Sequence, residues 1–340
     1  MGRPRVEQAA LTPGPPDLRP RRTAAAERPR EGTPPRSLTP RRPDAVGWRR
    51  GALGRATVAY LFLAPALVLL AVFTFYPVVF GTALSLFDYN VISPPRYVGV
   101  SQFAALWQDR YFWTALRNSG VYLAVVPALQ LSAIVLALWV RRPLRGIAWF
   151  RVAYYVPVVT SIVVVGLMWR WLYDEAGLLN YVLLRLHLIG TPIHWLSDPG
   201  IALYAVMLVT WWKGLGYYMV IYLAGLEAIP SYYDEAAALD GAGPAARLFH
   251  VTIPLLRPSI LLASTISILA ALRVFEEVYV MTGGGPIFST YTIFYYMFDQ
   301  AFNSLHLGYA AAIGVVLAAI TALFSAVNFR LMRQGGLSYY

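Results

Sequence analysis

The stretch Ile229 to Ile260, IPSYYDEAAALDGAGPAARLFHVTIPLLRPSI, is a polar segment between two hydrophobic ones. It carries five charged side chains. A charge in hydrocarbon costs about 2.5 to 3.5 kcal/mol on insertion scales, so this stretch cannot lie within a bilayer. It must sit in water beside a membrane, and the hydrophobic segments on either side are then expected to cross that membrane.

Local chemistry predicts two short helices in this stretch. Ser231 precedes Asp234 by three residues, as in a capping box, and residues 232–240 are rich in the helix former alanine. Gly241 then suits the left-handed residue that ends a helix, and Pro244 suits the first turn of a second helix. That helix is expected to run to about His250 and to be ended by the two prolines that follow it. Local features alone leave open whether a partner docks here or the stretch is only a surface connection.

The residues EAAALDGAGPAARLFHVTIPLLRP resemble the EAA loop of the integral membrane subunits of binding-protein-dependent ATP-binding-cassette (ABC) importers. In that family the loop implies a coupling helix that docks on the ATPase subunit. The matching positions, which the resemblance makes candidates for ATPase coupling, are Glu235, Ala236, Ala237, Asp240, Gly241, Ala242, Phe249, Ile253 and Pro254, followed by Pro258.

Composition agrees with a membrane protein. Of the 340 residues 58% are hydrophobic and 13% are charged, and the mean hydropathy is +0.54, whereas a soluble protein has about a quarter of its residues charged. The absence of cysteine excludes disulfides, thiolate metal sites and cysteine nucleophiles. The net charge of +11 does not indicate nucleic-acid binding, because 13 of the 28 basic residues lie in the first 55 positions and no aromatic-basic face accompanies them.

Residues 1–50 are rich in proline and arginine and lack apolar periodicity. They are expected to form a disordered basic cytoplasmic tail, with contact to anionic membrane lipid left open. A cleavable signal peptide is not expected, because the following apolar run is too long and lacks a small-residue cleavage site.

The fold class predicted is an all-α polytopic membrane protein with six transmembrane helices. Runs of about 20 apolar residues can cross a bilayer, and only helices satisfy so much backbone there without the alternation of a barrel. The permease domain is expected over residues 56–333, with the cytoplasmic EAA loop at 227–258 and spans at about 57–87, 118–140, 152–171, 201–226, 259–281 and 307–329.

Basic residues predict the orientation. They gather in the N-terminal tail, in the segment RRPLRGIAWFR at 141–151, in the EAA loop and near the C-terminus. With six spans these segments share one side, which the positive-inside rule makes the cytoplasm. Both termini are therefore expected inside a bacterial or archaeal cell membrane.

The resemblance extends from about Tyr60 to Arg333. The stretches WRWLYDEAGLLNYVL, WWKGLGYYMVIYLAGLEAIP and LRVFEEVYVMTGGGP are similar to the carbohydrate branch of these importers, of the maltose and glycerol-3-phosphate type. The run TGGGP and the later AFNSLHLGYAAAIG resemble the first of the two permeases that such systems encode. This resemblance implies the type I importer fold, a second homologous permease, two ATPase subunits that carry ATP and magnesium, and an extracytoplasmic solute-binding protein.

This chain is not expected to hydrolyse ATP, and no cofactor is expected on it. A P-loop needs Gly-x4-Gly-Lys-Ser/Thr, and the only lysine is Lys213, followed by Gly214 and Leu215. The four histidines are scattered without metal-ligand spacing. No catalytic residue and no metal site are predicted.

Polar side chains within the spans are candidates for the substrate pathway. On one continuous helix Arg273, Glu276 and Glu277 would share a face, as an ion pair or as a substrate-binding surface. Lys213 could likewise line the pathway or pair with an acidic group. Tyrosines suit a sugar, which has apolar C–H faces and polar hydroxyls, although helix packing is the commoner role of such rings. The candidate pathway residues are Lys213, Tyr217, Arg273, Glu276, Glu277 and Tyr279.

Two rival functions belong to other classes. A membrane enzyme such as a lipid-linked glycosyltransferase could use Glu276, Glu277 and Asp299 as acid and base groups, but no sizeable catalytic region accompanies them. A stand-alone secondary transporter would be expected to show inverted halves with paired broken helices, which the sequence does not show. The solute stays open between a sugar and a sugar-like anion such as glycerol phosphate.

Overall fold

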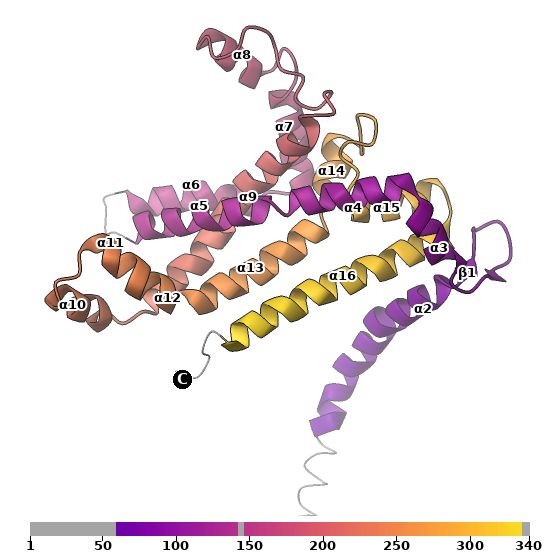
Figure 1. Ribbon diagram of the computed structural model, residues 1–340, viewed down its shortest axis with the longest axis horizontal. Helices are drawn as coiled ribbons and strands as arrows, with labels where there is room; N and C mark the ends of the chain where they lie inside the picture. Colours follow the sequence, from indigo (N-terminus) through magenta and orange to yellow (C-terminus); the bar gives the residue numbers. More distant parts are fainter. Residues whose placement is uncertain (1–58, 142–145, 335–340) are drawn as a thin grey trace, which may run out of the picture. The chain divides into compact units, whose positions relative to one another are not determined.

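The computed structural model describes residues 59–141 and 146–334 and is mostly helical there (Figure 1). The predicted tail at 1–50 lies outside the described residues. The first half contains η1 (Ala71–Phe75), α2 (Tyr76–Leu84), β1 (Phe87–Asp88), β2 (Arg96–Tyr97), α3 (Ser101–Gln108), α4 (Arg110–Tyr122), α5 (Val125–Val140), α6 (Ile147–Val159), α7 (Ile162–Leu172) and α8 (Leu178–Arg185). The second half contains α9 (Ala202–Glu227), α10 (Tyr232–Leu239), α11 (Pro244–Arg247), η2 (Leu248–Thr252), α12 (Ile253–Leu255), α13 (Arg257–Leu272), α14 (Glu276–Met281), α15 (Ile293–Phe298), η3 (Asp299–Asn303) and α16 (Leu307–Gln334).

Three helical stretches of the described chain are long and apolar enough to cross a membrane. They are Ala59–Leu84, Arg110–Val140 and Leu307–Arg330. The first and third agree with predicted spans. The second begins eight residues before the predicted boundary at 118, because Asp109 accepts a hydrogen bond from the Tyr111 backbone N–H (2.8 Å) and caps α4.

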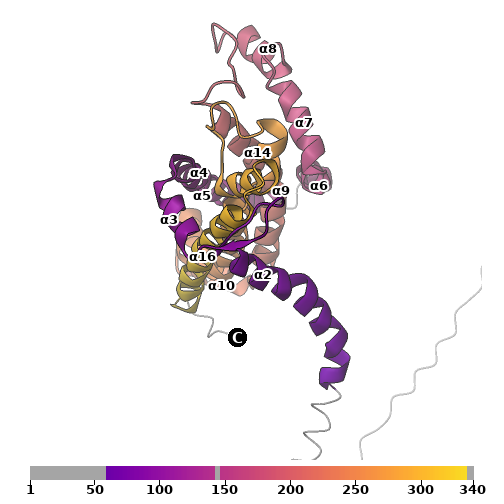
Figure 2. The ribbon, with the colours of Figure 1, turned by 90° about the vertical axis from the view of Figure 1, so that its right-hand side faces the viewer.

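The span predicted at 152–171 is not one straight helix. Helices α6 and α7 meet at an angle of 101°, and Figure 2 shows α8 beyond the far end of α7. Pro157 lies inside α6 and offers no N–H for the helical ladder. Thr160 and Ser161 then have extended backbone, with ψ of 138° and 135°. The chain therefore turns sharply where the hydropathy pattern is continuous.

The predicted span at 259–281 is also interrupted. Helix α13 ends at Leu272, and α14 begins at Glu276 after a short break. At its other end α13 meets the helical segment Pro244–Leu255 at 64°. Each bent pair could serve as one span, which gives up to five stretches able to cross a membrane among the described residues.

Helix α9 matches the predicted fourth span closely and is about 39 Å long. It is not among the stretches above, because its centre carries Lys213 together with tryptophan, tyrosine and glycine, which are less apolar. The count of six spans therefore stays a prediction.

Helix α9 packs against α5, α6 and α13, and small residues let the backbones approach closely. A Cβ on Gly216 would meet the backbone oxygen of Tyr154 in α6. A buried hydrogen-bond network joins α9 to α5 and α13. Tyr222 of α9 donates to Gln130 of α5, which donates to Ser267 of α13 (Nε2 to Oγ, 2.7 Å). Every hydrogen-bonding group in this network has a partner, as burial requires.

Asp109 ties the start of α4 to two distant helices. Its Oδ2 accepts from the hydroxyl groups of Tyr296 in α15 and Tyr309 in α16, each at 2.5 Å. Burial, together with the hydrogen bond to Asp109, raises the pKa of Tyr296 well above its usual value. Tyr296 therefore keeps its proton and remains a donor to the carboxylate.

Candidate functional site

Helix α10 ends in a Schellman motif centred on Gly241. The Gly241 N–H donates to the Ala238 oxygen (3.1 Å), and the Ala242 N–H donates to the Ala237 oxygen (2.9 Å). Gly241 has a φ of +81°, as the sequence predicted for a left-handed helix stop. A Cβ there would meet nothing within 4 Å inside the chain, so this turn is open to an approaching partner.

The prediction of a capping box at Ser231 is wrong. Ser231 has helical backbone angles, and its side chain makes no cap hydrogen bond. Its carbonyl oxygen instead accepts from the N–H groups of Asp234 (3.0 Å) and Glu235 (3.1 Å). Helix α10 begins at Tyr232, and backbone oxygens rather than the Ser231 side chain satisfy its first donors.

The second helix of the loop runs further than expected. It continues from α11 through the π-turn η2 into α12, past His250 to Leu255. Pro254 directly follows η2 and has no backbone N–H to donate within this continuing helix. The bend falls at buried Leu256, whose side chain packs beside Gly225 of α9.

An ion pair fixes α10 against α11. Arg247 Nη1 donates to Asp234 Oδ2 at 2.9 Å. The pair is partly exposed, so it contributes little energy in water, but it joins two segments that contact each other at few other places. The two helices therefore form one unit rather than two independent turns.

Six of the nine predicted coupling residues lie on α10 or directly after it, whereas Phe249 lies in η2 and Ile253 and Pro254 lie in α12. Not all of them are exposed. Seven of the eight α10 residues are exposed. The motif residues Glu235, Ala236, Asp240 and Gly241 are exposed, and so is Phe249, at 66%. Ala237, Ala242, Ile253 and Pro254 are half-buried. Leu239, which the motif reading missed, has 90% of its surface exposed, and an apolar side chain in that position of a polar loop is the signal that could have found it.

A second group of predicted residues meets inside the helices. A cavity of about 240 Å³ is lined by Lys213, Gly214 and Tyr217 of α9, together with residues of α4, α5, α6 and α13. Lys213 is half-buried, and its Nζ donates to the Val158 carbonyl oxygen of α6 at 3.3 Å. This carbonyl lies next to Pro157, near the bend between α6 and α7.

Glu277 belongs to a hydrogen-bonded row across three helices. Its Oε1 accepts from Thr210 Oγ1 (3.5 Å), whose hydroxyl also bonds the Tyr122 hydroxyl (2.5 Å). Among the described residues Lys213 and Glu277 form no ion pair within 4 Å. We call Tyr122, Thr210, Lys213 and Glu277 the polar cluster.

Arg273 does not share a helix face with the glutamates. It caps the end of α13, whereas Glu276 and Glu277 begin α14, so helical spacing does not relate them. Within residues 59–141 and 146–334 no ion pair joins Arg273 to either glutamate, and Arg273 and Glu276 are exposed. The ion-pair interpretation is therefore wrong for this triplet.

The two tyrosines predicted to line the substrate pathway lie in different surroundings. Tyr217 lines the cavity and meets Tyr218 edge to face, with ring centres 5.1 Å apart. Tyr279 stacks on Phe275 at 5.3 Å and belongs to an aromatic group with Tyr295 and Phe298. Thr210 and Tyr122 were missed. Thr210 lies three residues before Lys213, so helical spacing could have found it, whereas Tyr122 reaches the cluster from a different helix.

A family model described as "Binding-protein-dependent transport system inner membrane component" matches residues 120–334, which include the coupling loop and the polar cluster. The chain belongs to this family. The family resemblance drawn from the EAA loop is thereby confirmed.

Relatives in the family cover nearly the whole described chain. The lactose transport system permease protein LacF of Rhizobium radiobacter is 34% identical over 81% of this chain and 94% of its own length. The diacetylchitobiose uptake system permease protein NgcF of Streptomyces coelicolor is 36% identical over 85% of this chain and 86% of its own. The chain is thus a multi-pass membrane protein and a transport component.

A solved structure shares the fold. It is a bacterial alginate ABC transporter in complex with alginate pentasaccharide-bound periplasmic protein, with a TM-score of 0.72 and 22% identity over 84% of this chain and 96% of that chain. The prediction of a type I ABC importer permease fold is confirmed.

Proposed function

We propose that this chain is one of two permease subunits of an ABC importer for a sugar or sugar-like solute. An external binding protein delivers the solute, and the α10–α12 loop couples the permease to ATP hydrolysis on separate subunits that bind ATP and magnesium. The loop is the observation that supports the proposal. Helix α10 is braced by the Asp234–Arg247 ion pair and ends at an open glycine, and the loop exposes Leu239 of α10 and Phe249 of η2. An exposed apolar side chain on a braced helix suits a groove of a partner protein.

The solute class rests on the relatives and on the polar cluster. Two relatives are named as permease proteins of lactose transport and of diacetylchitobiose uptake, and both of these solutes are saccharides. The cavity at Lys213 joins apolar walls with hydroxyl, ammonium and nearby carboxylate groups, and this mixture suits a sugar. The proposed orientation places both termini and the loop in the cytoplasm, and the cavity on the path between the two permeases.

Co-expression tests the function. The chain would be produced with the ATPase, second permease and binding protein encoded beside it, purified through a tag on this chain, and reconstituted in vesicles. We expect all membrane subunits to co-purify and ATP-dependent uptake of a saccharide to require the binding protein. Solute movement by this chain alone, or co-purification of no ATPase, would contradict the proposal.

A further inference from the structure

A basin of about 620 Å³ lies among the loops that follow α7 and α14 and the turn at residues 194–197. Its surface is mostly polar, in contrast to the largely apolar cavity at Lys213. The lining includes Arg170, Glu175, His194, Trp195 and Ser197. None of these residues belongs to the coupling loop or to the polar cluster.

Packing and hydrogen bonds hold the walls of the basin in place; they are buried at Asn180 and exposed at His194 and Glu175. Asn180 is fully buried, and its Oδ1 accepts from Trp195 Nε1 at 3.0 Å. The Trp195 ring packs on Tyr173 with centres 5.5 Å apart. His194 Nδ1 lies 2.7 Å from Glu175 Oε1. Fixed polar groups beside a fixed ring are what a small-molecule site requires, because little side-chain freedom is lost on binding.

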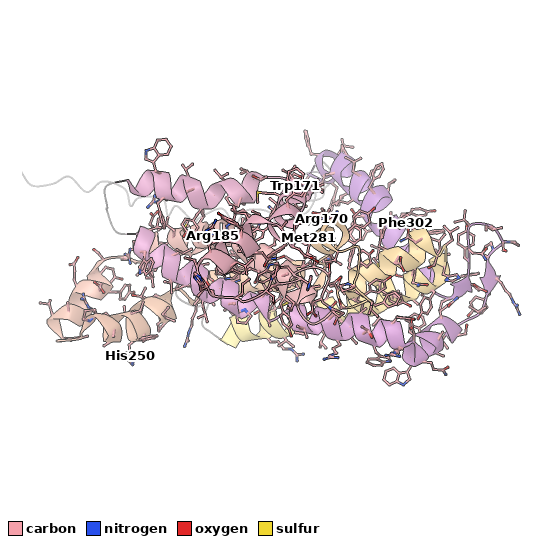
Figure 3. All side chains as sticks on the ribbon, turned by 90° about the horizontal axis from the view of Figure 1, so that it is seen from above. Arg170, Trp171, Arg185, His250, Met281 and Phe302 are labelled. Atoms are coloured by element: carbon pink, nitrogen blue, oxygen red, sulfur yellow. The ribbon has the colours of Figure 1, made fainter. Side chains whose placement is uncertain are left out.

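Helix α14 connects this basin to the polar cluster. Met281 and the following residue Thr282 line the basin, and Glu277 near the other end of α14 bonds Thr210. The helix has six residues and is about 9 Å long. Arg170 Nη1 donates to the Val280 oxygen at 3.4 Å, and Figure 3 shows Arg170 near Met281, so α7 and α14 meet at this edge. A solute leaving the basin would need to pass only one short helix to reach the cluster.

The basin carries no excess of positive charge. One arginine, Arg170, accompanies two carboxylates there, Asp174 and Glu175. A phosphate or carboxylate would therefore find no excess positive charge. Sugar hydroxyls can donate to these carboxylates and accept from arginine and histidine, while the face of Trp195 suits apolar C–H groups.

We propose that the basin formed by the 170–176, 194–197 and 281–286 segments binds a neutral saccharide before the saccharide reaches the polar cluster. This inference rests on the proposed function, which it extends by a second binding place and by a solute class.

The first test fills the basin. Ser197 is exposed and lines the basin, so Ser197→Trp should occupy it, whereas Ser93→Trp changes an exposed outer-loop serine that is not part of the lining. The assembled transporter is assayed with a neutral disaccharide, chosen from maltose, lactose, cellobiose and trehalose by its binding to the external binding protein. We expect Ser197→Trp to lower uptake about tenfold while the loaded binding protein still stimulates ATP hydrolysis, and Ser93→Trp to leave both unchanged.

The second test measures occupancy directly. The chain has no cysteine, so Ser197→Cys and Ser93→Cys each introduce one thiol. The neutral disaccharide should slow modification of Cys at 197 by a water-soluble thiol reagent, and its uronic-acid counterpart should not; the rate at 93 should not change.

Four results separate the possible errors. Normal uptake by Ser197→Trp, or protection of position 197 by the acidic sugar alone, would overturn the saccharide site. Loss of ATPase stimulation in Ser197→Trp would make the basin a docking face for the binding protein instead. A wild-type assembly without saccharide uptake would refute the proposed function itself.

Discussion

Gly241 occupies a backbone position that disfavours side chains, because its φ is +81° and both hydrogen bonds of the Schellman motif depend on it. A substitution there costs about 1 kcal/mol of local strain. We expect Gly241→Asp to insert normally but to lower uptake strongly, with the ATPase released or no longer stimulated by the loaded binding protein. Transport assays and co-purification measure this.

The matched control is two residues away. Gly243 has a φ of −68°, and a Cβ there also meets nothing within 4 Å, so Gly243→Asp adds the same charge without the strain. Uptake by the Gly243→Asp variant should stay closer to wild-type uptake than uptake by the Gly241→Asp variant. Glu235→Ala should also act mildly, because it loses a first-turn charge worth about 0.3 to 1 kcal/mol but gains helix propensity. Undiminished uptake and stimulated hydrolysis by Gly241→Asp would show that the loop is only a connection.

One residue, Asn180, holds together the loop between α7 and α9. Its Nδ2 donates to the carbonyls of Asp174 (3.3 Å), Glu175 (3.2 Å) and Ile193 (3.0 Å), and its Oδ1 also accepts from the Ile193 N–H (3.1 Å). Each buried group left without a partner costs about 1 to 3 kcal/mol. Asn180→Ala should therefore expose residues 186–194 to limited proteolysis at concentrations that spare wild type. The exposed Asn303→Ala, which loses one bond to Asp299, should behave like wild type.

At the scale of elements, glycine decides how closely helices approach. Gly216 of α9 lies against the Tyr154 backbone of α6, whereas a Cβ on Gly120 of α4 would meet nothing within 4 Å. We expect Gly216→Ala to separate α6 from α9 and to lower the melting temperature of the purified protein. Gly120→Ala should raise it slightly, because alanine is favoured over glycine inside a helix by about 0.5 to 1 kcal/mol.

Both substitutions replace glycine with alanine, so a difference between their melting temperatures reports how closely α6 packs on α9. Equal melting temperatures would mean that α6 is not closely packed on α9. The same contact positions the Val158 carbonyl for Lys213, so Gly216→Ala should also reduce uptake in protein that remains folded.

At the scale of the whole molecule, Lys213 and Glu277 of the polar cluster, together with Arg273, are predicted to face a cavity shared with a second permease rather than lipid. The cost of a charge in hydrocarbon favours water at these positions. Single cysteines at Lys213, Arg273 and Glu277 should each react with small water-soluble thiol reagents in at least one state of the transport cycle. Cysteine at Leu323, an exposed apolar position on α16, should stay unreactive. Uniform inertness at the three charged positions would contradict the shared cavity.

Much of this architecture follows from local sequence. Long apolar runs must become helices in a bilayer, since the backbone has no other source of hydrogen bonds there, and the ends of α9 and the start of α16 fall within two residues of the predicted boundaries. Gly241 was predictable because a left-handed helix stop depends on only a few neighbouring residues. The EAA pattern likewise identified the family from one loop.

Tertiary structure decided what depends on residues far apart in the chain. Hydropathy is continuous across Thr160, yet the helices bend there, and the predicted span at 259–281 breaks after Leu272, which separates Arg273 from Glu277. The Tyr122–Thr210–Glu277 row, the Asp234–Arg247 brace and the polar basin each join segments that no local pattern relates. Periodicity describes one helix at a time, whereas a binding site is formed where several helices place their side chains together.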